Sequence, residues 1–183
     1  MLAFSMLLPV GCDKIKEATS HNFSVRDVKI DFTAITQPLL VESQTNVPVM
    51  RAGSTSSFLV TRTVNLSDFG STELMDYANR ITKVVVNNST VDVSTVPAGN
   101  FKVTNLKIKY SETASGSLTI SEYTVGETFT PPSTMGTFLG GFVLKLVHDR
   151  AISVTVSGET DAPVGTEINV SYEGDIVFTA SVL

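Results

Sequence analysis

The sequence contains few of the residues from which catalytic and metal sites are usually built. Its 183 residues include one cysteine, two histidines and no tryptophan. A lone cysteine cannot form a disulfide within the chain, so a hydrophobic core must stabilise the fold. Two widely separated histidines do not have the ligand spacing of a zinc site. The lack of tryptophan disfavours a sugar site that works by stacking on that ring.

Charge is sparse as well, and acidic residues exceed basic ones. The formal net charge is -5 and the isoelectric point is about 5.0. The largest basic group lies at 106–110, where Lys107 and Lys109 alternate with apolar residues and predict the solvent face of a strand. We therefore expect no nucleic-acid partner.

The one cysteine, Cys12, stands where the composition changes. It follows the uncharged run 1–11 and precedes a polar stretch at 13–17. A small residue at Gly11 permits cleavage, and the Cys12 thiol can carry a diacylglycerol that holds a protein at a membrane. The run resembles a bacterial lipoprotein signal, although Pro9 stands where Leu is usual and no Lys or Arg precedes it. The alternative is an ordinary first strand with a buried thiol at Cys12.

These observations predict how the chain is divided. We expect a signal peptide at 1–11, a lipidated tether at 12–22 and a single β-sandwich domain at 23–183. The apolar run is about half of the roughly 20 residues that a membrane-spanning helix needs. The rest of the chain has the length of one domain.

Apolar and polar residues alternate along most of the chain, a period of two that predicts half-buried β-strands. The pattern begins at 28–34, where Val28 and Ile30 share one face and Lys29 and Asp31 the other. It returns at 58–64, 84–86, 91–93, 101–110, 118–125, 152–156, 168–172 and 176–182. Eight or more such strands, with one or two short helices, predict an all-β fold, an antiparallel β-sandwich of immunoglobulin-like or related Greek-key type.

Short segments rich in Asn, Gly, Pro and Asp separate these runs and predict turns. They lie at 87–89, 97–100, 161–165 and 173–175. Short connections of this composition favour hairpins between antiparallel neighbours.

Three segments break the alternation. Residues 71–81 carry apolar residues at helical spacing after a cap at Ser71, which predicts a short helix. Residues 135–147 carry a wide apolar stripe, capped by Ser133 or Thr134, which we expect to plug one open end of the sandwich. The alternative is a docking helix for a partner or a membrane surface. Residues 37–56 predict a long loop with an irregular edge strand.

Of the two histidines, His148 is the candidate for catalysis, since His21 lies in the expected tether. His148 neighbours Asp149 and Arg150 at a helix end, where histidine and arginine complement the negative end of the helix dipole. The chain has no Gly-x-Ser-x-Gly motif. We therefore expect a protein that is not an enzyme and uses no cofactor. An envelope hydrolase that uses His148 or clustered acids is the alternative.

One tyrosine is a candidate for ligand binding. Tyr77, Tyr110 and Tyr172 fall in phase with inward positions, which leaves Tyr123, near Gly126, as the expected exposed ring. A single exposed tyrosine is a weak basis for sugar binding.

Four acids could form a calcium site. Glu159 and Asp161 lie in one expected turn, and Glu173 and Asp175 lie in another. Their oxygens are suitable calcium ligands if both turns meet at one end of the sandwich. Solvent-exposed acids in separate turns are the alternative.

The chain as a whole resembles the small, uncharacterised β-sandwich lipoproteins of Bacteroidetes envelopes. The features that carry this resemblance are Cys12, the charged tether, the Val- and Thr-rich strands and the Ala-Ser-Val-Leu terminus. The resemblance implies a lipid-anchored protein of the cell envelope, at the outer membrane or cell surface, with an envelope protein or a glycan as partner. The leading hypothesis is a noncatalytic binding or adhesion module, and the alternative is a structural subunit of an envelope or fimbria-like assembly.

Overall fold

The computed structural model describes residues 20–42, 48–50, 56–113, 116–127 and 134–182. Cys12, the expected signal peptide and most of the expected tether lie outside these ranges. So does Ser133, one of the two expected caps of the second helix.

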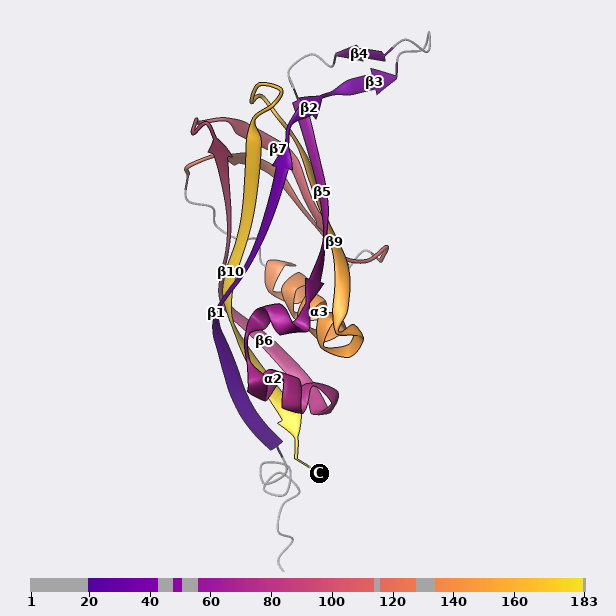
Figure 1. Ribbon diagram of the computed structural model, residues 1–183, viewed down its shortest axis with the longest axis vertical. Helices are drawn as coiled ribbons and strands as arrows, with labels where there is room; N and C mark the ends of the chain where they lie inside the picture. The colour runs from indigo at the N-terminus through magenta and orange to yellow at the C-terminus, as the bar shows by residue number, and fades with distance from the viewer. Residues whose placement is uncertain (1–19, 43–47, 51–55, 114–115, 128–133, 183) are drawn as a thin grey trace, which may run out of the picture.

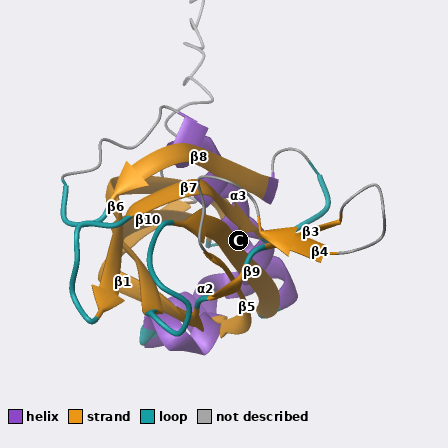
Figure 2. Ribbon diagram, turned by 90° about the horizontal axis from the view of Figure 1, so that it is seen from above, coloured by secondary structure: helices purple, strands orange, loops and turns teal. Residues whose placement is uncertain are grey.

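Two antiparallel sheets form the body of the molecule (Figure 1). The first sheet has the order β1-β10-β6, with β1 at Ser20–Ile35, β10 at Glu167–Ser181 and β6 at Ile81–Val96. The second has the order β2-β5-β9-β7-β8, and its strands are β2 at Gln37–Pro38, β5 at Ser56–Asn65, β9 at Ala151–Thr160, β7 at Lys102–Lys109 and β8 at Ser117–Thr124. Viewed along the long axis, the sheets curve around a shared interior (Figure 2). The predicted all-β sandwich is confirmed.

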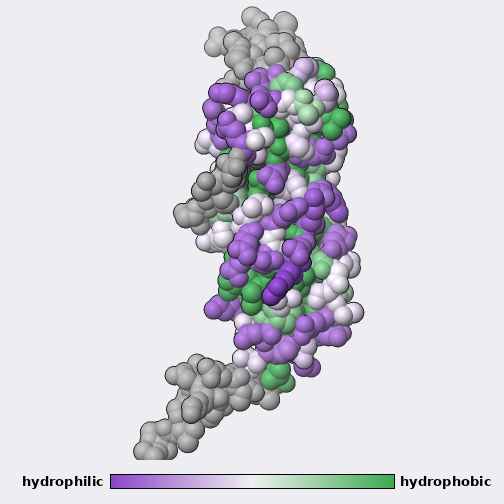
Figure 3. Space-filling view, turned by 90° about the vertical axis from the view of Figure 1, so that its left-hand side faces the viewer, coloured by the Kyte–Doolittle hydropathy of each residue, from purple (hydrophilic) through white to green (hydrophobic). Residues whose placement is uncertain are grey.

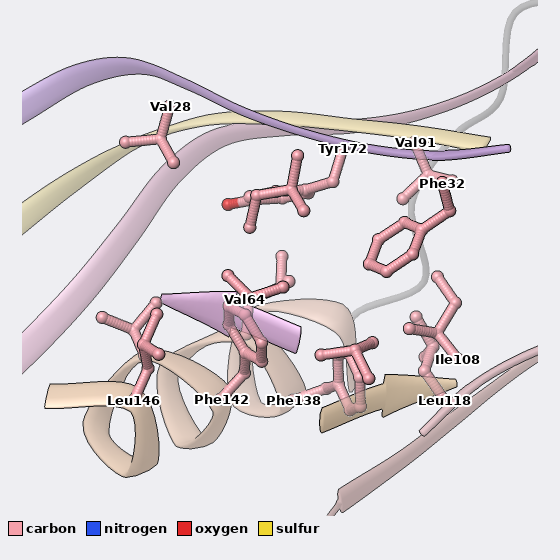
Figure 4. Close-up of a cluster of buried hydrophobic side chains, with 14 of the residues drawn as sticks. Val28, Phe32, Val64, Val91, Ile108, Leu118, Phe138, Phe142, Leu146 and Tyr172 are labelled. Atoms are coloured by element: carbon pink, nitrogen blue, oxygen red, sulfur yellow. The ribbon is translucent and has the colours of Figure 1, made fainter. Parts of the chain in front are cut away.

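The alternation of the sequence determines which side chains fill the interior. In β1, Val28, Ile30 and Phe32 are buried, whereas Lys29 and Asp31 are exposed. The same alternation buries one face of β9 and of β10. Figure 4 shows side chains of the first sheet facing Val64, Ile108, Leu118 and helix α3 across the core.

Strand β1 begins earlier than the expected domain boundary at residue 23. Ser20, His21 and Asn22 pair with the end of β10 and therefore belong to the sheet, not to a tether. The His21 ring lies 4.9 Å from the Tyr77 ring, and its Nε2 lies 2.6 Å from Glu73 Oε1. The reason is that His21 has the same phase as Phe23, so its ring reaches the aromatic cluster at this end of the sheet.

The segments 87–89 and 173–175 are not turns, which corrects the expected hairpins. Each lies inside one long strand, β6 or β10, at a place where the register between the two strands shifts. Asn88 adopts a left-handed φ of 49°. Asn tolerates that conformation, so it suits a β-bulge as well as a turn. The glycine at position 174 is explained by packing, because a Cβ there would lie 2.5 Å from the Tyr172 hydroxyl.

The segments 97–100 and 161–165 do connect strands, but not as hairpins. The first joins β6 to β7 and the second joins β9 to β10, and in both cases the two strands belong to different sheets. Turn residues specify that the chain reverses. They do not specify which strand it then pairs with.

The first predicted helix is confirmed as a short, three-part segment. Helix α2, at Thr72–Tyr77, is capped by Ser71, whose Oγ accepts a hydrogen bond from Leu74 N at 3.1 Å. Short 3-10 turns flank it, η1 at Leu66–Phe69 and η2 at Ala78–Arg80. Leu74 is fully buried, so the segment covers the core where the first sheet extends beyond the second.

The second predicted helix, α3, spans Thr134–Asp149, and its apolar stripe faces the core. Tyr110 of the second sheet packs against Phe138, with 5.1 Å between ring centroids. Gly141 permits this approach, since a Cβ there would lie 2.6 Å from the Tyr110 hydroxyl. The stripe is therefore occupied by intramolecular packing, and α3 contacts β6, β8 and β9.

The expected irregular segment 37–56 contains two features. Strand β2 pairs with β5 at the edge of the second sheet. Strands β3, at Leu40–Glu42, and β4, at Pro48–Met50, form a separate two-stranded sheet. This small sheet extends from the upper end of the molecule in Figure 1.

Candidate functional site

Tyr123 is buried, which corrects the expectation of an exposed ring. Its exposed fraction is 6%, and its hydroxyl donates a hydrogen bond to the Glu127 carbonyl at 3.0 Å. Burial raises the pKa of Tyr123. The alternation of β8 changes phase at Ser121 and Glu122, which are both exposed. Tyr123 therefore points inward although Ser121 and the preceding odd-numbered positions point outward.

The four acids proposed for calcium do not meet. Glu159 pairs across from Ser57 in the second sheet, and Asp161 Oδ1 accepts a hydrogen bond from Lys102 N at 2.7 Å. Glu173 and Asp175 lie in the middle of β10, about 20 Å from the strand end at the usual rise per residue. Across the described ranges, no group of three His, Cys, Asp or Glu residues is arranged to hold a metal ion.

Glu173 and Asp175 instead line a polar hollow of about 400 Å³ on the outer face of the first sheet. Asp175 accepts hydrogen bonds from the Asn88 amide at 2.9 Å and from Asp27 N at 3.2 Å, and these two contacts lower its pKa. Lys29 Nζ lies 3.1 Å from Glu173 Oε1, which raises the pKa of Lys29. These contacts join the three strands where they bulge, so the hollow has a structural explanation.

His148 lies at the end of α3, exposed to solvent. Its Nδ1 is 2.6 Å from Asp149 Oδ1, and Lys145 Nζ is 2.6 Å from the other carboxylate oxygen. Lys145 and then His148 lower the pKa of Asp149. This is the ion pairing expected at the negative end of a helix.

An apolar cavity of about 30 Å³ lies between the sheets and α3, with Phe32, Met135 and Phe138 in its wall. That is room for about two water molecules, but Tyr172 and the other residues around it turn no polar atom toward the cavity. The nearby Tyr172 hydroxyl is buried without a partner among the described residues and points toward Val28 (Figure 4). The cavity is therefore a gap in the packing.

The strongest candidate site is a recess of about 380 Å³ between the edges of the two sheets. One wall consists of residues 90–94, five successive residues of β6, and the other contains Tyr123, Gly126 and Glu127. Within the described part of the chain, no strand pairs with the outer edge of β6. Sequence reasoning missed this recess, because edge strands are determined by long-range pairing.

The backbone of β6 borders this recess, although Val91 and Val93 are only 3% and 4% exposed. A hydrogen bond from the Val93 backbone favours the ionised form of Tyr123, so the Val93 N–H is the donor and points to the outer edge. Alternate residues of a strand direct their backbone groups to the same side, so those of Val91 and Thr95 also point outward. The side chains of Thr90, Asp92 and Ser94 are exposed on the outer face of the sheet.

On the long face shown in Figure 3, hydrophobic side chains appear as separate patches between hydrophilic ones. None of the helices in the described ranges combines the length and apolar content needed to span a membrane. Comparisons with protein-family models, curated proteins and solved structures found no match.

Proposed function

We propose that this protein is a noncatalytic binding module of the cell envelope that holds an extended segment of another protein along β6. The recess of about 380 Å³ beside residues 90–94 is the observation that carries this proposal. Edge strands present unpaired N–H and C=O groups, and addition of an extended segment satisfies them. A lipid on Cys12 would hold the module at a membrane of the envelope, where its partner is encountered.

The edge of β6 suits this mode of binding because its apolar side chains face the core and its polar side chains face solvent. Val91 and Val93 are buried in the core, while Asp92 and Ser94 lie on the solvent side. A segment that pairs with this edge would continue the first sheet and displace the Tyr123 hydroxyl from the Val93 backbone. The hydrogen bonds come from the backbone, and the exposed side chains supply selectivity.

The proposal is tested by photocrosslinking in intact cells that express the full chain. A photoreactive residue replaces Asp92 in one strain and Leu59 in another. Leu59 is a matched control, since it is 69% exposed on a strand of the other sheet. We expect a defined protein adduct from position 92 and none from position 59. Equal adducts from both positions, or none from position 92, would overturn the proposal.

The identity of the adduct separates the two hypotheses of the sequence analysis. An adduct with a different protein supports a binding module. An adduct between two copies of this chain contradicts it and supports a structural subunit of an assembly. Labelling the same cells with a palmitate analogue tests the anchor, because the label should be lost in Cys12→Ala.

A further inference from the structure

We infer that the segment bound at β6 is basic and alternating, with Lys or Arg on one side and apolar residues on the other. This inference rests on the proposed function and deepens it by naming the chemistry of the partner. It follows from the side chains that border the recess on its two faces.

The solvent side of the recess is acidic. Asp92 projects from the outer face of β6, and Glu127 lies on the opposite wall. The adjoining hollow shares Thr90 with the recess and adds the carboxylates of Glu173 and Asp175. Two cations lie near these four carboxylates: Lys29, which pairs with Glu173 and Asp31 and is also close enough to interact with Asp92, and Arg26, which interacts with Asp175. The surface beside the edge therefore retains an excess of negative charge.

The core side of the recess is apolar. Val91 and Val93 point inward from β6, and the Tyr123 ring closes the space opposite them. Successive side chains of an added strand alternate between the two faces of the sheet. Those on the outer face would lie beside Asp92, and those on the inner face beside Val91 and Val93. Opposite charges in neighbouring strands stabilise a sheet, and like charges destabilise it.

Three synthetic peptides of about nine residues, the length of a typical strand, test this inference. The first alternates Val and Lys, and the second alternates Val and Glu. The third is the Val-Lys peptide with alternate backbone nitrogens methylated, which keeps the charge and prevents strand pairing. Binding to the purified full-length chain is measured by fluorescence anisotropy at physiological salt.

We expect the Val-Lys peptide to bind about tenfold more tightly than the Val-Glu peptide, as several favourable cross-strand pairs replace unfavourable ones. The methylated peptide should bind much more weakly than its parent. Asp92→Lys should remove the preference for Lys. The matched control is Asp76→Lys, which makes the same charge change on exposed helix α2 and should leave the preference intact.

The outcomes separate the inference from the function on which it rests. If the Val-Lys and Val-Glu peptides bind equally and both require free backbone nitrogens, strand addition holds and the basic preference is wrong. If the methylated peptide binds as well as its parent, or no peptide binds, addition at the β6 edge is itself wrong. A preference for Lys that survives Asp92→Lys would overturn the assignment of Asp92.

Discussion

The two sides along which the sheets meet are built differently. On one side, which we call the closed seam, β1 faces β5, and the chain itself crosses from one sheet to the other. Beyond the end of β1 at Ile35, the chain passes through Thr36 and then pairs with β5 through β2. Lower on this side, the Arg62 guanidinium donates a hydrogen bond to the Asp31 carbonyl at 2.7 Å. Polar contacts thus join the sheets at both levels.

Thr36 is the centre of the closed seam. Its backbone N–H donates to the Thr166 carbonyl at 2.9 Å, and its carbonyl accepts from Gly165 N at 3.0 Å. Its side-chain hydroxyl donates to the Pro163 carbonyl and accepts from Thr166 N, both at 2.8 Å. The residue is 1% exposed. All its polar groups are therefore satisfied without water.

The other side, the open seam, lies between the edges of β6 and β8. The Tyr123 hydroxyl reaches across it to the Val93 backbone and donates to the Glu127 carbonyl on its own side, and the recess of about 380 Å³ lies alongside. The comparison shows that one sandwich can have both a corner closed by buried hydrogen bonds and an edge bordered by a recess. Several buried hydrogen bonds fill the closed seam, whereas at the open seam α3 packs against β6 and β8 and the recess lies beside residues 90–94.

The largest expected loss of stability comes from a substitution in the closed seam. Thr36→Val keeps the shape of the side chain but removes the hydroxyl that bonds both Pro163 and Thr166. Leaving buried polar groups with fewer partners should lower the free energy of unfolding by about 2 kcal/mol. Urea denaturation at neutral pH measures this loss.

Thr119→Val is the control for this substitution. Thr119 is exposed on β8, so the same chemical change should alter the free energy of unfolding by less than about 0.5 kcal/mol. If the two variants unfold at the same urea concentration, the closed seam does not depend on the Thr36 hydroxyl.

The difference between the seams also separates what the sequence could predict from what it could not. The inward residues of β1, the Ser71 cap and the stripe of α3 follow from local spacing, and all three were predicted correctly. Whether these side chains are buried depends on the spacing of apolar residues, and a short stretch of sequence is enough to show that spacing. The closed and open seams depend on which distant strands pair, and no local pattern carries that information.

The incorrect predictions share a physical origin. Polar, turn-forming residues at Asn88 and Gly174 were read as strand ends, but the same residues permit bulges inside long strands. A change of phase within β8, at Ser121 and Glu122, likewise turns Tyr123 inward. Both features alter a strand by a single residue. Such a change leaves the composition intact and moves side chains to the opposite face.

A smaller loss of stability is expected from a substitution in the open seam. Tyr123→Phe removes the hydroxyl that contacts the Val93 backbone and Glu127, which should lower the free energy of unfolding by about 1 kcal/mol. The same change frees the Val93 N–H for an incoming strand, so binding of the Val-Lys peptide should become about fivefold tighter. Urea denaturation and fluorescence anisotropy measure the two effects. If both stability and affinity fall, Tyr123 supports the binding edge and does not compete for it.

The smallest change in stability at neutral pH is expected at Tyr172, which lies in the core between the two seams. Its hydroxyl is buried and has no hydrogen-bond partner among the described residues. Tyr172→Phe should therefore leave the free energy of unfolding unchanged or raise it by about 1 kcal/mol. This result would contrast with the loss expected for Tyr123→Phe, since the two changes remove the same atom from differently bonded positions.

Alkaline pH should reveal the burial of Tyr172 more clearly. Burial raises the pKa of Tyr172 above its ordinary value of 10.0, because the folded state disfavours the charged form. The stabilisation is complete below pH 10 and is lost as the pH rises above it, since the unfolded tyrosine then ionises while the folded one stays protonated. Urea denaturation at about pH 8 and about pH 10.5 should show a loss of stability that is smaller in Tyr172→Phe. An equal loss in both proteins would mean that Tyr172 reaches solvent, and its hydroxyl would then not be a buried group without a hydrogen-bond partner.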